Sequence, residues 1–578
     1  MSAYTYEEIG KNIQRCNARL GISVSFEDEN SLHKKFQSAV NSGSRHIEMS
    51  SLAKHGGARN FDMSSSMISE IRHSADLNVV TLGVHASPDI NICGSGNNGF
   101  SSEIRDHSIR EGKAAIDFCH VIKGKHVVIH ANSFSRPVSE IDPELFGSKN
   151  TGSYYLVDPR TEEITSIPEQ ESVFIPKQAK GEKGNLLWIL DRNRKPVLNT
   201  ATQKPIPRLA VDADGRIEGE QVRFGEYIRR MSREGKTSNE AVKDFFHLWH
   251  AGEINRVYLN LVAAERTLAE AQSRRDRLQD TLEYYRNLEG VLPQEERYRL
   301  ERTMRDSLNS ADIAVPSDVR SACLLLEDEL RENQRTLESS RQSIVRGWPQ
   351  LTDAIEHLRE IMSLKEFGLQ IIAESIAELG EYAISLDGGR ISLSIENLPL
   401  PYMYGSSTRE LLEIIEESRK LLELRLKKLG YSSSESKALS NSCIKATLDI
   451  GHLNLCRQYY IGETFPKWVV SQVRYLGKYN ISNVHLSDNR GLDDSHLLPG
   501  EGNAPIKEAL SALLDLGYRE FIVIEGAVSQ QAVKYTLDLF GIVPRGSNDE
   551  LMREFNARDG VSGMKWKDDP ERPSFGKD

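Results

Sequence analysis

Short apolar runs alternate with longer amphipathic stretches over the first 130 residues, and the same alternation returns near residue 365. The runs, such as GISVSF at 21–26, are rich in β-branched residues, and the stretches, such as 102–122, repeat apolar residues at helical spacing. Short strands separated by such helices are typical of βα units around a parallel sheet. The expected strands lie within 21–26, 46–51, 78–87, 125–133, 390–399, 445–455, 481–489 and 520–528.

Four of these strands precede a long interruption and four follow it. Eight βα units predict an α/β fold, a (β/α)8 TIM barrel, with the interruption as an insertion after strand four. We assign 1–133 to the first half of the barrel, 134–360 to the insertion, 361–541 to the second half and 542–578 to a tail. The tail is polar, charged and poor in apolar residues, so we expect it to be disordered.

The insertion contains two different patterns. Residues 150–225 carry three segments centred on Asp, Pro, Gly or Asn turns, which predict β-hairpins in a small β module. Residues 238–345 repeat apolar residues three, four or seven apart, with a break near NLEGVLPQEE, and predict an antiparallel helical hairpin. Arg275 falls on the apolar seam, so strict coiled-coil pairing stays open. The hairpin could serve as a structural arm, in self-association or in binding a protein partner.

Composition and charge exclude several classes of protein. No apolar run approaches 18 residues and the N-terminus is not basic and then apolar, so we expect neither a membrane span nor a secretory signal. An intracellular, cytoplasmic protein is therefore expected. The six cysteines show no C-x-x-C spacing, which argues against a disulfide framework and a thiolate zinc site. The net charge of −11 gives no general attraction to nucleic acids, so a polyanion would need a local patch or bound metal ions.

Imidazole and carboxylate side chains close six of the eight expected strands. In a TIM barrel the carboxyl ends of the strands form one mouth, where the chemistry takes place. A single histidine there is commonly a core or capping residue, but an ionised carboxylate at the end of an apolar strand needs a compensating charge. The side chains at the strand ends and in the loop DNRGLDDSHLLPGEG are His85, His130, Glu396, Asp449, His452, His485, Asp494, His496 and Glu525.

This set offers nitrogen and oxygen ligands without thiolates. Such ligands suit Zn²⁺, Mn²⁺ or Fe, and three protein ligands with an open position are the pattern of catalytic sites. Nine ligands are too many for one ion. The sequence therefore predicts a site for two or three metal ions with a bridging carboxylate.

The strand-end motifs also match a known family. The motifs VHAS, VVIHANS, LSIENLP, TLDIGHL, VHLSDN, DSHLLPGEG and VIEGA resemble, in the same order, those of the endonuclease IV type of apurinic/apyrimidinic endonuclease in the xylose-isomerase-like TIM-barrel superfamily. The resemblance covers roughly 1–133 and 365–541 and not the insertion.

The resemblance implies three ions, for which zinc is the first candidate. The implied ligands are His85 and His130 for the first ion, Glu396 bridging to a second held by Asp449, His485 and Glu525, and His452, Asp494 and His496 for the third. It also implies hydrolysis of the DNA backbone 5′ to an abasic site in DNA repair, leaving a 3′-hydroxyl. Metal-activated water would attack phosphorus and the third ion would stabilise the leaving oxygen. Glu396 and Glu525 would be catalytic.

The chain departs from the family pattern where DNA would be contacted. The family places an aromatic residue just after the strand-three histidine to fill the gap in the DNA, whereas this chain has Pro88 and Asp89. The loop LAKHGGARNF could supply contacts through Lys54 and Arg59, although an ordinary basic glycine loop is an equal alternative. Asn91 is a further candidate for substrate binding.

Two other functions compete with a nuclease. A sugar isomerase or epimerase on the same barrel needs one divalent ion, held by the second ligand set alone, and abstracts a proton beside a carbonyl. It would give Asp494 and His496 no role. A non-catalytic scaffold that binds a partner through its helical arm is the other alternative. Clustered carboxylates without metal would repel one another, which argues against it.

Overall fold

The computed structural model describes most of the chain. The described residues are 5–15, 19–26, 28–51, 63–96, 99–131, 134–136, 138, 141–142, 144–146, 153–199, 203–288, 319–356, 361–526 and 530–542. The tail expected to be disordered lies outside them from residue 543 onward. The chain forms two compact units, one of Met1–Ser166 with Leu364–Asp578 and the other of Ile167–Ser363.

Parallel strands close into a barrel in the first unit, in the order β1-β13-β12-β11-β10-β4-β3-β2. The strands are β1 (Arg19–Phe26), β2 (His46–Ser51), β3 (Thr81–His85), β4 (His126–His130), β10 (Ser392–Glu396), β11 (Ile444–Asp449), β12 (Ile481–Leu486) and β13 (Phe521–Ile524). Strands β12 and β13 are buried at every position, as expected of a parallel sheet covered by helices outside and filled by side chains inside. The predicted (β/α)8 TIM barrel is confirmed.

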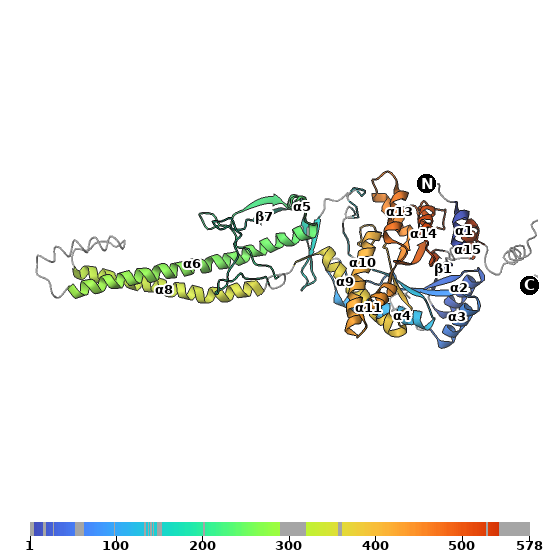
Figure 1. Ribbon diagram of the computed structural model, residues 1–578, viewed down its shortest axis with the longest axis horizontal. Helices are drawn as coiled ribbons and strands as arrows, with labels where there is room; N and C mark the ends of the chain where they lie inside the picture. Colours follow the sequence, from blue (N-terminus) through green and yellow to red (C-terminus); the bar gives the residue numbers. More distant parts are fainter. Residues whose placement is uncertain are drawn as a thin grey trace, which may run out of the picture. The chain divides into compact units, whose positions relative to one another are not determined.

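Helices surround these strands and begin at clear sequence signals (Figure 1). A capping box of Ser407 and Glu410 begins α10 (Thr408–Lys428), and one of Asp28 and Ser31 begins α2 (Glu29–Asn41). The helices of this unit are α1 (Tyr6–Arg15), α2 (Glu29–Asn41), α3 (Ser65–Leu77), α4 (Ser102–Val121), α9 (Leu364–Asp387), α10 (Thr408–Lys428), α11 (Ser433–Cys443), α12 (Ile450–Leu455), the 3-10 helix η2 (Cys456–Tyr459), α13 (Phe465–Leu476), α14 (Ile506–Asp515) and α15 (Gln530–Leu539).

Residues 134–166, which the sequence pattern assigned to the insertion, belong to the same compact unit as the barrel. Phe146 is buried edge-on against Trp468, with ring centroids 5.1 Å apart, and Phe134 stacks on Tyr404 at 5.0 Å. These aromatic contacts bury the start of the excursion against the second half of the barrel. The second compact unit therefore begins only at Ile167.

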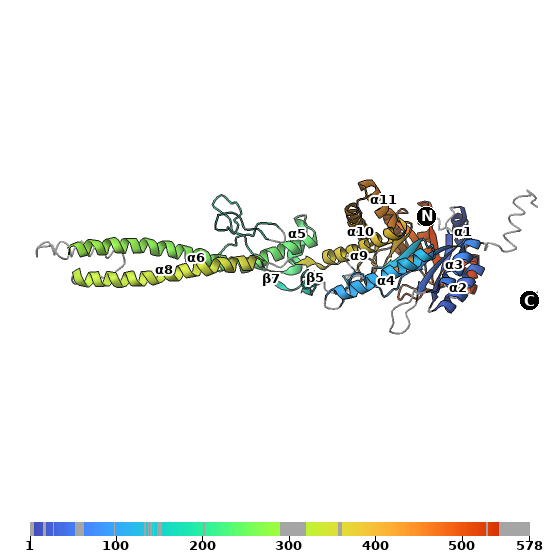
Figure 2. The ribbon, with the colours of Figure 1, turned by 90° about the horizontal axis from the view of Figure 1, so that it is seen from below.

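The second unit combines a small β module with two long helices (Figure 2). Strands β7 (Ser172–Pro176) and β8 (Gly219–Arg223) pair antiparallel, and single bridges such as Leu190 to Pro196 and Val211 to Ile217 close turns between them. The remaining elements between β4 and α9 are β5 (Ser153–Val157), which belongs to the first unit, β6 (Ile164–Pro168), α5 (Phe224–Arg233), α6 (Ser238–Leu288), α8 (Val319–Glu356) and β9 (Met362–Ser363).

Helices α6 and α8 lie side by side and run antiparallel (Figures 1 and 2). Asn333 donates a hydrogen bond to the carbonyl of Ala271, while Gly347 contacts Leu261. Residue numbers along α8 therefore rise as those of their partners on α6 fall, which is the antiparallel arrangement. Arg275, the residue that left strict coiled-coil pairing open, is partly exposed and forms an ion pair with Asp276. It therefore does not place a charge in the buried seam.

Two findings bear on the compositional expectations. Among the residues that the structure describes, no helix combines the length and the apolar character needed to cross a membrane. The described cysteines Cys93, Cys119, Cys323, Cys443 and Cys456 are all buried and free.

Candidate metal centre

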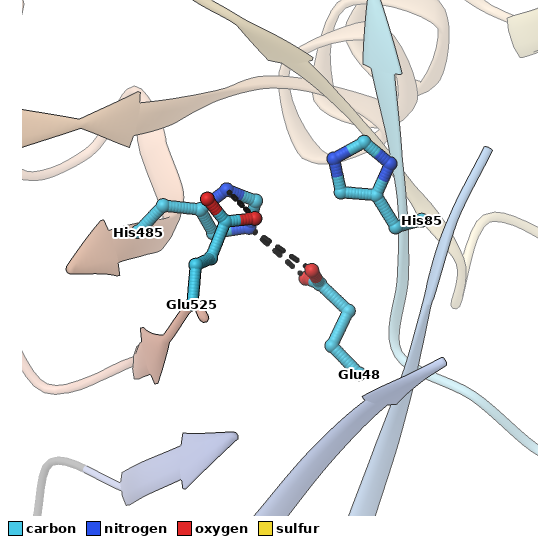
Figure 3. Close-up of side chains that lie close together, drawn as sticks. All are labelled: Glu48, His85, His485 and Glu525. Atoms are coloured by element: carbon cyan, nitrogen blue, oxygen red, sulfur yellow. Dashed lines mark hydrogen bonds and ion pairs between the residues drawn. The ribbon is translucent and has the colours of Figure 1, made fainter. Parts of the chain in front are cut away.

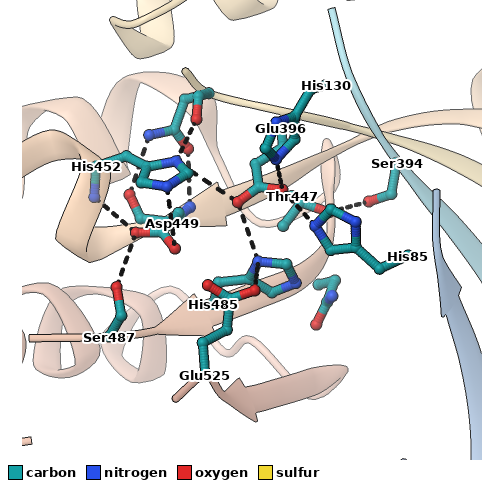
Figure 4. A network of polar contacts seen from close by, with 12 residues as sticks. His85, His130, Ser394, Glu396, Thr447, Asp449, His452, His485, Ser487 and Glu525 are labelled. Atoms are coloured by element: carbon teal, nitrogen blue, oxygen red, sulfur yellow. Dashed lines mark hydrogen bonds and ion pairs between the residues drawn. The ribbon is translucent and has the colours of Figure 1, made fainter. Parts of the chain in front are cut away.

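The strand-end histidines and carboxylates meet at one mouth of the barrel (Figure 4). The strand register places them side by side. His130 pairs with Glu396 across β4 and β10, and Asp449 pairs with His485 across β11 and β12. Asp449 and His485 are fully buried. The others line one cavity of about 470 Å³ and are His85, His130, Glu396, His452, Asp494, His496 and Glu525.

Two histidines share one oxygen of Glu396. The Nε2 atoms of His85 and His130 lie 3.2 and 2.9 Å from Oε2 of Glu396. Nδ1 of His85 lies 2.6 Å from the carbonyl oxygen of Ala86, and because a carbonyl only accepts, this nitrogen carries a proton. In the neutral ring the lone pair is then on Nε2 and faces the carboxylate. A metal-binding histidine has this orientation, with the opposite nitrogen held by an acceptor.

His485 lies among carboxylates in a second group. Its Nδ1 is 3.0 Å from Oε1 of Glu396 and 3.0 Å from Oε1 of Glu525. Asp449 completes the group, and the ligand atoms of all four residues lie within 4.8 Å of one another. Among the described residues, Oδ2 of Asp449 is buried without a hydrogen-bond partner. A buried carboxylate oxygen in this state is costly unless a cation compensates it.

The third group lies nearer to solvent. Oδ2 of Asp494 is 3.2 Å from Nε2 of His452 and 2.9 Å from Nε2 of His496. Nδ1 of His452 lies 2.7 Å from the carbonyl oxygen of Asn397, so this ring too carries a proton on Nδ1 and turns Nε2 toward Asp494. The side chains of Asp494 and His496 are 28% and 38% exposed, which leaves the group open to a ligand.

Burial and the charges of neighbouring carboxylates and imidazoles shift the pKa values of the cluster. Burial raises the pKa of Asp449 to about 7, with Glu525 and Glu396 adding to the effect and His452 opposing it. Burial also acts to raise the pKa of Glu396, but the imidazoles of His485 and His130 outweigh it and hold this pKa well below its usual value. Bound cations would take over the compensation that imidazolium protons otherwise supply.

A hydrogen bond to Asp494 raises the pKa of His496 to about 9. His496 also has a backbone φ of 46°, a left-handed conformation that is uncommon outside glycine. The carbonyl oxygen of His496 approaches Gly526 so closely that a Cβ there would lie 2.4 Å from it. Gly526, with a φ of 75°, follows Glu525 directly, so the end of β13 leaves room for the loop that carries the third group.

Asp488 anchors this loop and was not among the predicted site residues. Its carboxylate accepts hydrogen bonds from the backbone N–H groups of Gly500, Gly502 and Ala504 at 2.9, 3.0 and 2.9 Å. Its own backbone pairs in both directions with Leu497. The turn through PGEG is therefore folded around one buried carboxylate, which fixes the positions that precede it. The acid in the motif VHLSDN, three residues after His485, was the available sequence signal.

Sequence reasoning missed two further charged residues near the site. Lys35 on α2 lines the cavity, and its ammonium donates to the carbonyl of Ser25 at 2.7 Å. Glu48 lies in the middle of β2, fully buried, and contacts His485. In the run HIEMSS, the polar residues His46 and Glu48 alternate with apolar ones. Because alternate residues of a barrel strand face inward, this pattern could have revealed Glu48.

The three expected substrate contacts have different outcomes. Lys54 and Arg59 lie outside the described residues. Asn91 is described, and its side chain makes two hydrogen bonds with the backbone of Ser95, at 2.8 and 3.3 Å. It lines a separate hollow with Phe134 and Tyr155 and not the metal-ligand cavity.

Fold and site together define an α/β barrel whose mouth carries histidine and carboxylate groups that could bind metal ions. Residues 428–542 match the model of a family described as Xylose isomerase-like TIM barrel. An uncharacterized protein of Methanocaldococcus jannaschii is 30% identical over 166 residues, which cover 28% of this chain and 47% of that protein. Fructoselysine 3-epimerase of Escherichia coli is 30% identical over 73 residues, which cover 13% of this chain and 25% of the epimerase. The chain thus spans less than half the length of these relatives.

Two solved structures are similar at low identity. A D-tagatose 3-epimerase-like protein has 13% identity and a TM-score of 0.36, with 93% of this chain and 99% of that chain covered. Endonuclease IV from Thermus thermophilus has 10% identity and a TM-score of 0.36, with 90% of this chain and 97% of that chain covered.

Proposed function

We propose that the chain is a metal-dependent phosphodiesterase that hydrolyses the DNA backbone 5′ to abasic sites. The observation that supports this proposal best is the presence of three ligand groups around one cavity, of which two share Glu396 and the third stands at the rim. Hydrolysis of a phosphodiester develops charge on the phosphate and on the leaving oxygen at the same time. A site with more than one cation meets both needs.

The donor set fits three divalent ions, with zinc as the first candidate. His85 and His130 would hold one ion together with Glu396, which would bridge to a second ion held also by the group around His485. The rim group of His452, Asp494 and His496 would hold the third. Nitrogen and oxygen ligands without thiolates suit zinc in catalytic sites and admit Mn²⁺ or Fe.

Bound divalent ions would activate water as the nucleophile and neutralise charge on the phosphate and the leaving oxygen. The chain itself contributes orientation and charge. The carbonyl oxygens of Ala86 and Asn397 fix the rings of His85 and His452. Lys35 in the cavity wall offers an ammonium group to a phosphate. The bound ions and the Lys35 ammonium would together let a protein of net charge −11 hold DNA.

The test uses the full chain and a duplex with one synthetic abasic site. Cleavage on the 5′ side is expected from the wild type and is expected to be lost in the double variant Asp494→Ala, His496→Ala. Asp493→Ala is the matched control, because Asp493 is an exposed neighbour in the same loop and belongs to none of the ligand groups. An intact duplex with the metal-loaded wild type, or equal cleavage by the double variant, would contradict the proposal.

A sugar epimerase is the second candidate, favoured by the 73-residue match to fructoselysine 3-epimerase. Such an enzyme needs only the group of Glu396, Asp449, His485 and Glu525. The same double variant separates the two functions. An epimerase should interconvert ketoses equally well in the wild type and in Asp494→Ala, His496→Ala, whereas Glu525→Gln should abolish the activity.

A further inference from the structure

Below the mouth of the barrel, Glu48 forms a buried polar layer with His126 and Asn483 that the predicted ligand set did not include. Glu48 lies on β2 and pairs along the sheet with Gly83 of β3, two positions before the pair of Ser50 with His85. Its side chain is fully buried. Burying an ionised carboxylate is costly unless several donors compensate it, so the contacts of Glu48 need an explanation.

Three donors converge on the carboxylate of Glu48. Nδ2 of Asn483 donates to Oε2 at 2.7 Å, and Nε2 of His126 lies 3.1 Å from the same oxygen. Nε2 of His485 is hydrogen-bonded to this oxygen too, at 3.3 Å, and lies 3.1 Å from Oε1 (Figure 3). An amide N–H can only donate, so Oε2 must accept there. The carboxylate is thereby held in place by β4 and β12 and turned toward the ring of His485.

The opposite nitrogen of this ring faces the metal-ligand groups. Nδ1 of His485 is 3.0 Å from an oxygen of Glu396 and 3.0 Å from an oxygen of Glu525 (Figure 4). When Nε2–H donates to Glu48, the neutral ring carries its lone pair on Nδ1, between two carboxylates. That arrangement is repulsive without a cation and ideal with one. A carboxylate behind a metal-binding histidine fixes its tautomer and raises its basicity.

We propose that Glu48 is a positioning residue for the metal centre. It holds the ring of His485 so that Nδ1 is free to bind an ion. The inference rests on the proposed metal site and concerns a residue outside it. Strands β2 and β12 are not neighbours, because β1 and β13 stand between them in the barrel, so the contact spans the interior. Gly83 permits the layer, since a Cβ there would lie 2.5 Å from Nε2 of His126.

The test measures metal binding, independently of activity. Metal-free full-length protein is titrated with Zn²⁺ against a chromophoric chelator, and the ions bound at saturation are counted by elemental analysis. Glu48→Gln is expected to keep the wild-type number of ions but to bind the second ion about 10- to 100-fold more weakly. Nitrogen-15 spectra of the zinc-loaded, imidazole-labelled protein should show His485 protonated on Nε2 alone in the wild type and a mixture of states in the variant.

Two further variants guard against a purely structural effect. Asn483→Ala removes one donor from Glu48 and should weaken binding to a smaller extent, which keeps the idea testable if Glu48→Gln does not fold. Thr81→Val is the matched control, because Thr81 hydrogen-bonds to His46 and not to Glu48. Each variant disturbs buried hydrogen bonds and is expected to lose some stability without metal, so the comparison is made on metal loading. The rise in unfolding temperature on loading should be smaller in Glu48→Gln and Asn483→Ala than in the wild type and in Thr81→Val.

Unchanged affinity in Glu48→Gln would overturn the proposal. Loss of one whole ion at saturation would also overturn it, because Glu48 would then be a metal ligand itself. The ligand atoms of Glu48, His85, His485 and Glu525 lie close enough together for that role. If the wild type binds no metal at all, the proposed function fails first and independently of Glu48.

Discussion

Oδ2 of Asp488 accepts a hydrogen bond from the backbone N–H of Gly502 at 3.0 Å, while a Cβ on Gly502 would lie 2.3 Å from Oδ1. The carboxylate and the glycine thus fit each other, and between them the chain carries Asp494 and His496. The position of the third ligand group depends on a turn that is itself built around a buried charge.

Asp488→Asn keeps the shape of the side chain and removes its charge. We expect the free energy of unfolding of the barrel to fall by about 1.5–3 kcal/mol, because backbone N–H groups lose a charged acceptor. Binding of the third ion should weaken while the other two ions stay. Urea unfolding and a metal titration would check both effects. Asp493→Asn, an exposed change in the same loop, should leave both quantities as they are.

Gly526→Ala tests the close approach of the loop to β13. The new Cβ would lie 2.4 Å from the carbonyl oxygen of His496, so we expect a loss of stability and a weaker third metal site. The left-handed backbone alone should cost about 1–2 kcal/mol. Overpacking should add about 1–3 kcal/mol.

Gly388→Ala separates the two contributions. Gly388 has a φ of 71° and nothing within 4 Å of a new Cβ, so it carries the backbone cost without the clash. Equal destabilisation by the two substitutions in thermal unfolding would show that the His496 loop moves away freely, contrary to the expectation.

Removal of metal should lower the stability of the barrel unit and leave the insertion unchanged. A ligand that binds only the folded state stabilises it by about 4 kcal/mol at a free concentration 1,000 times its dissociation constant. Calorimetry before and after dialysis against a chelator should show one transition moving to lower temperature. An equal shift of every transition would argue that the ions are not confined to the barrel mouth.

His247 in α6 should make the insertion sensitive to acid. Burial lowers its pKa below the ordinary value of 6.5, with Lys204 adding to the effect and the carbonyl of Pro205 and Asp244 opposing it. Below that value the unfolded chain takes up the proton more readily than the folded one, so stability is present above about pH 6.5 and falls as the pH drops toward the lowered pKa.

Hydrogen exchange of peptides from 238–288 at several pH values would measure this loss. His247→Gln can still donate to the carbonyl of Pro205 but does not titrate, so its pH profile should be flatter over the same range. An identical profile in the variant would assign the acid sensitivity to another group.

The sequence alone predicted the barrel because its signals are local. A strand shows itself by a short β-branched run, a helix by its period and its cap, and both depend on residues close together in the chain. The strand ends then follow, and with them the candidate ligands from His85 to Glu525. The insertion boundary was less accessible, since 134–166 is assigned to the barrel unit by long-range contacts such as the burial of Phe134 and Phe146 and the ion pair of Arg136 with Glu410.

The tertiary structure decided what stands behind the ligands. Glu48 and His485 are 437 positions apart and lie on strands that are not neighbours, so no local pattern connects them. The tautomers of His85 and His452 depend on carbonyl groups that the register of the closed barrel and the start of α12 bring into place. The sequence determines which residues are histidines. Which ring nitrogen faces a bound cation depends on the hydrogen-bond acceptor that the fold places at the other nitrogen.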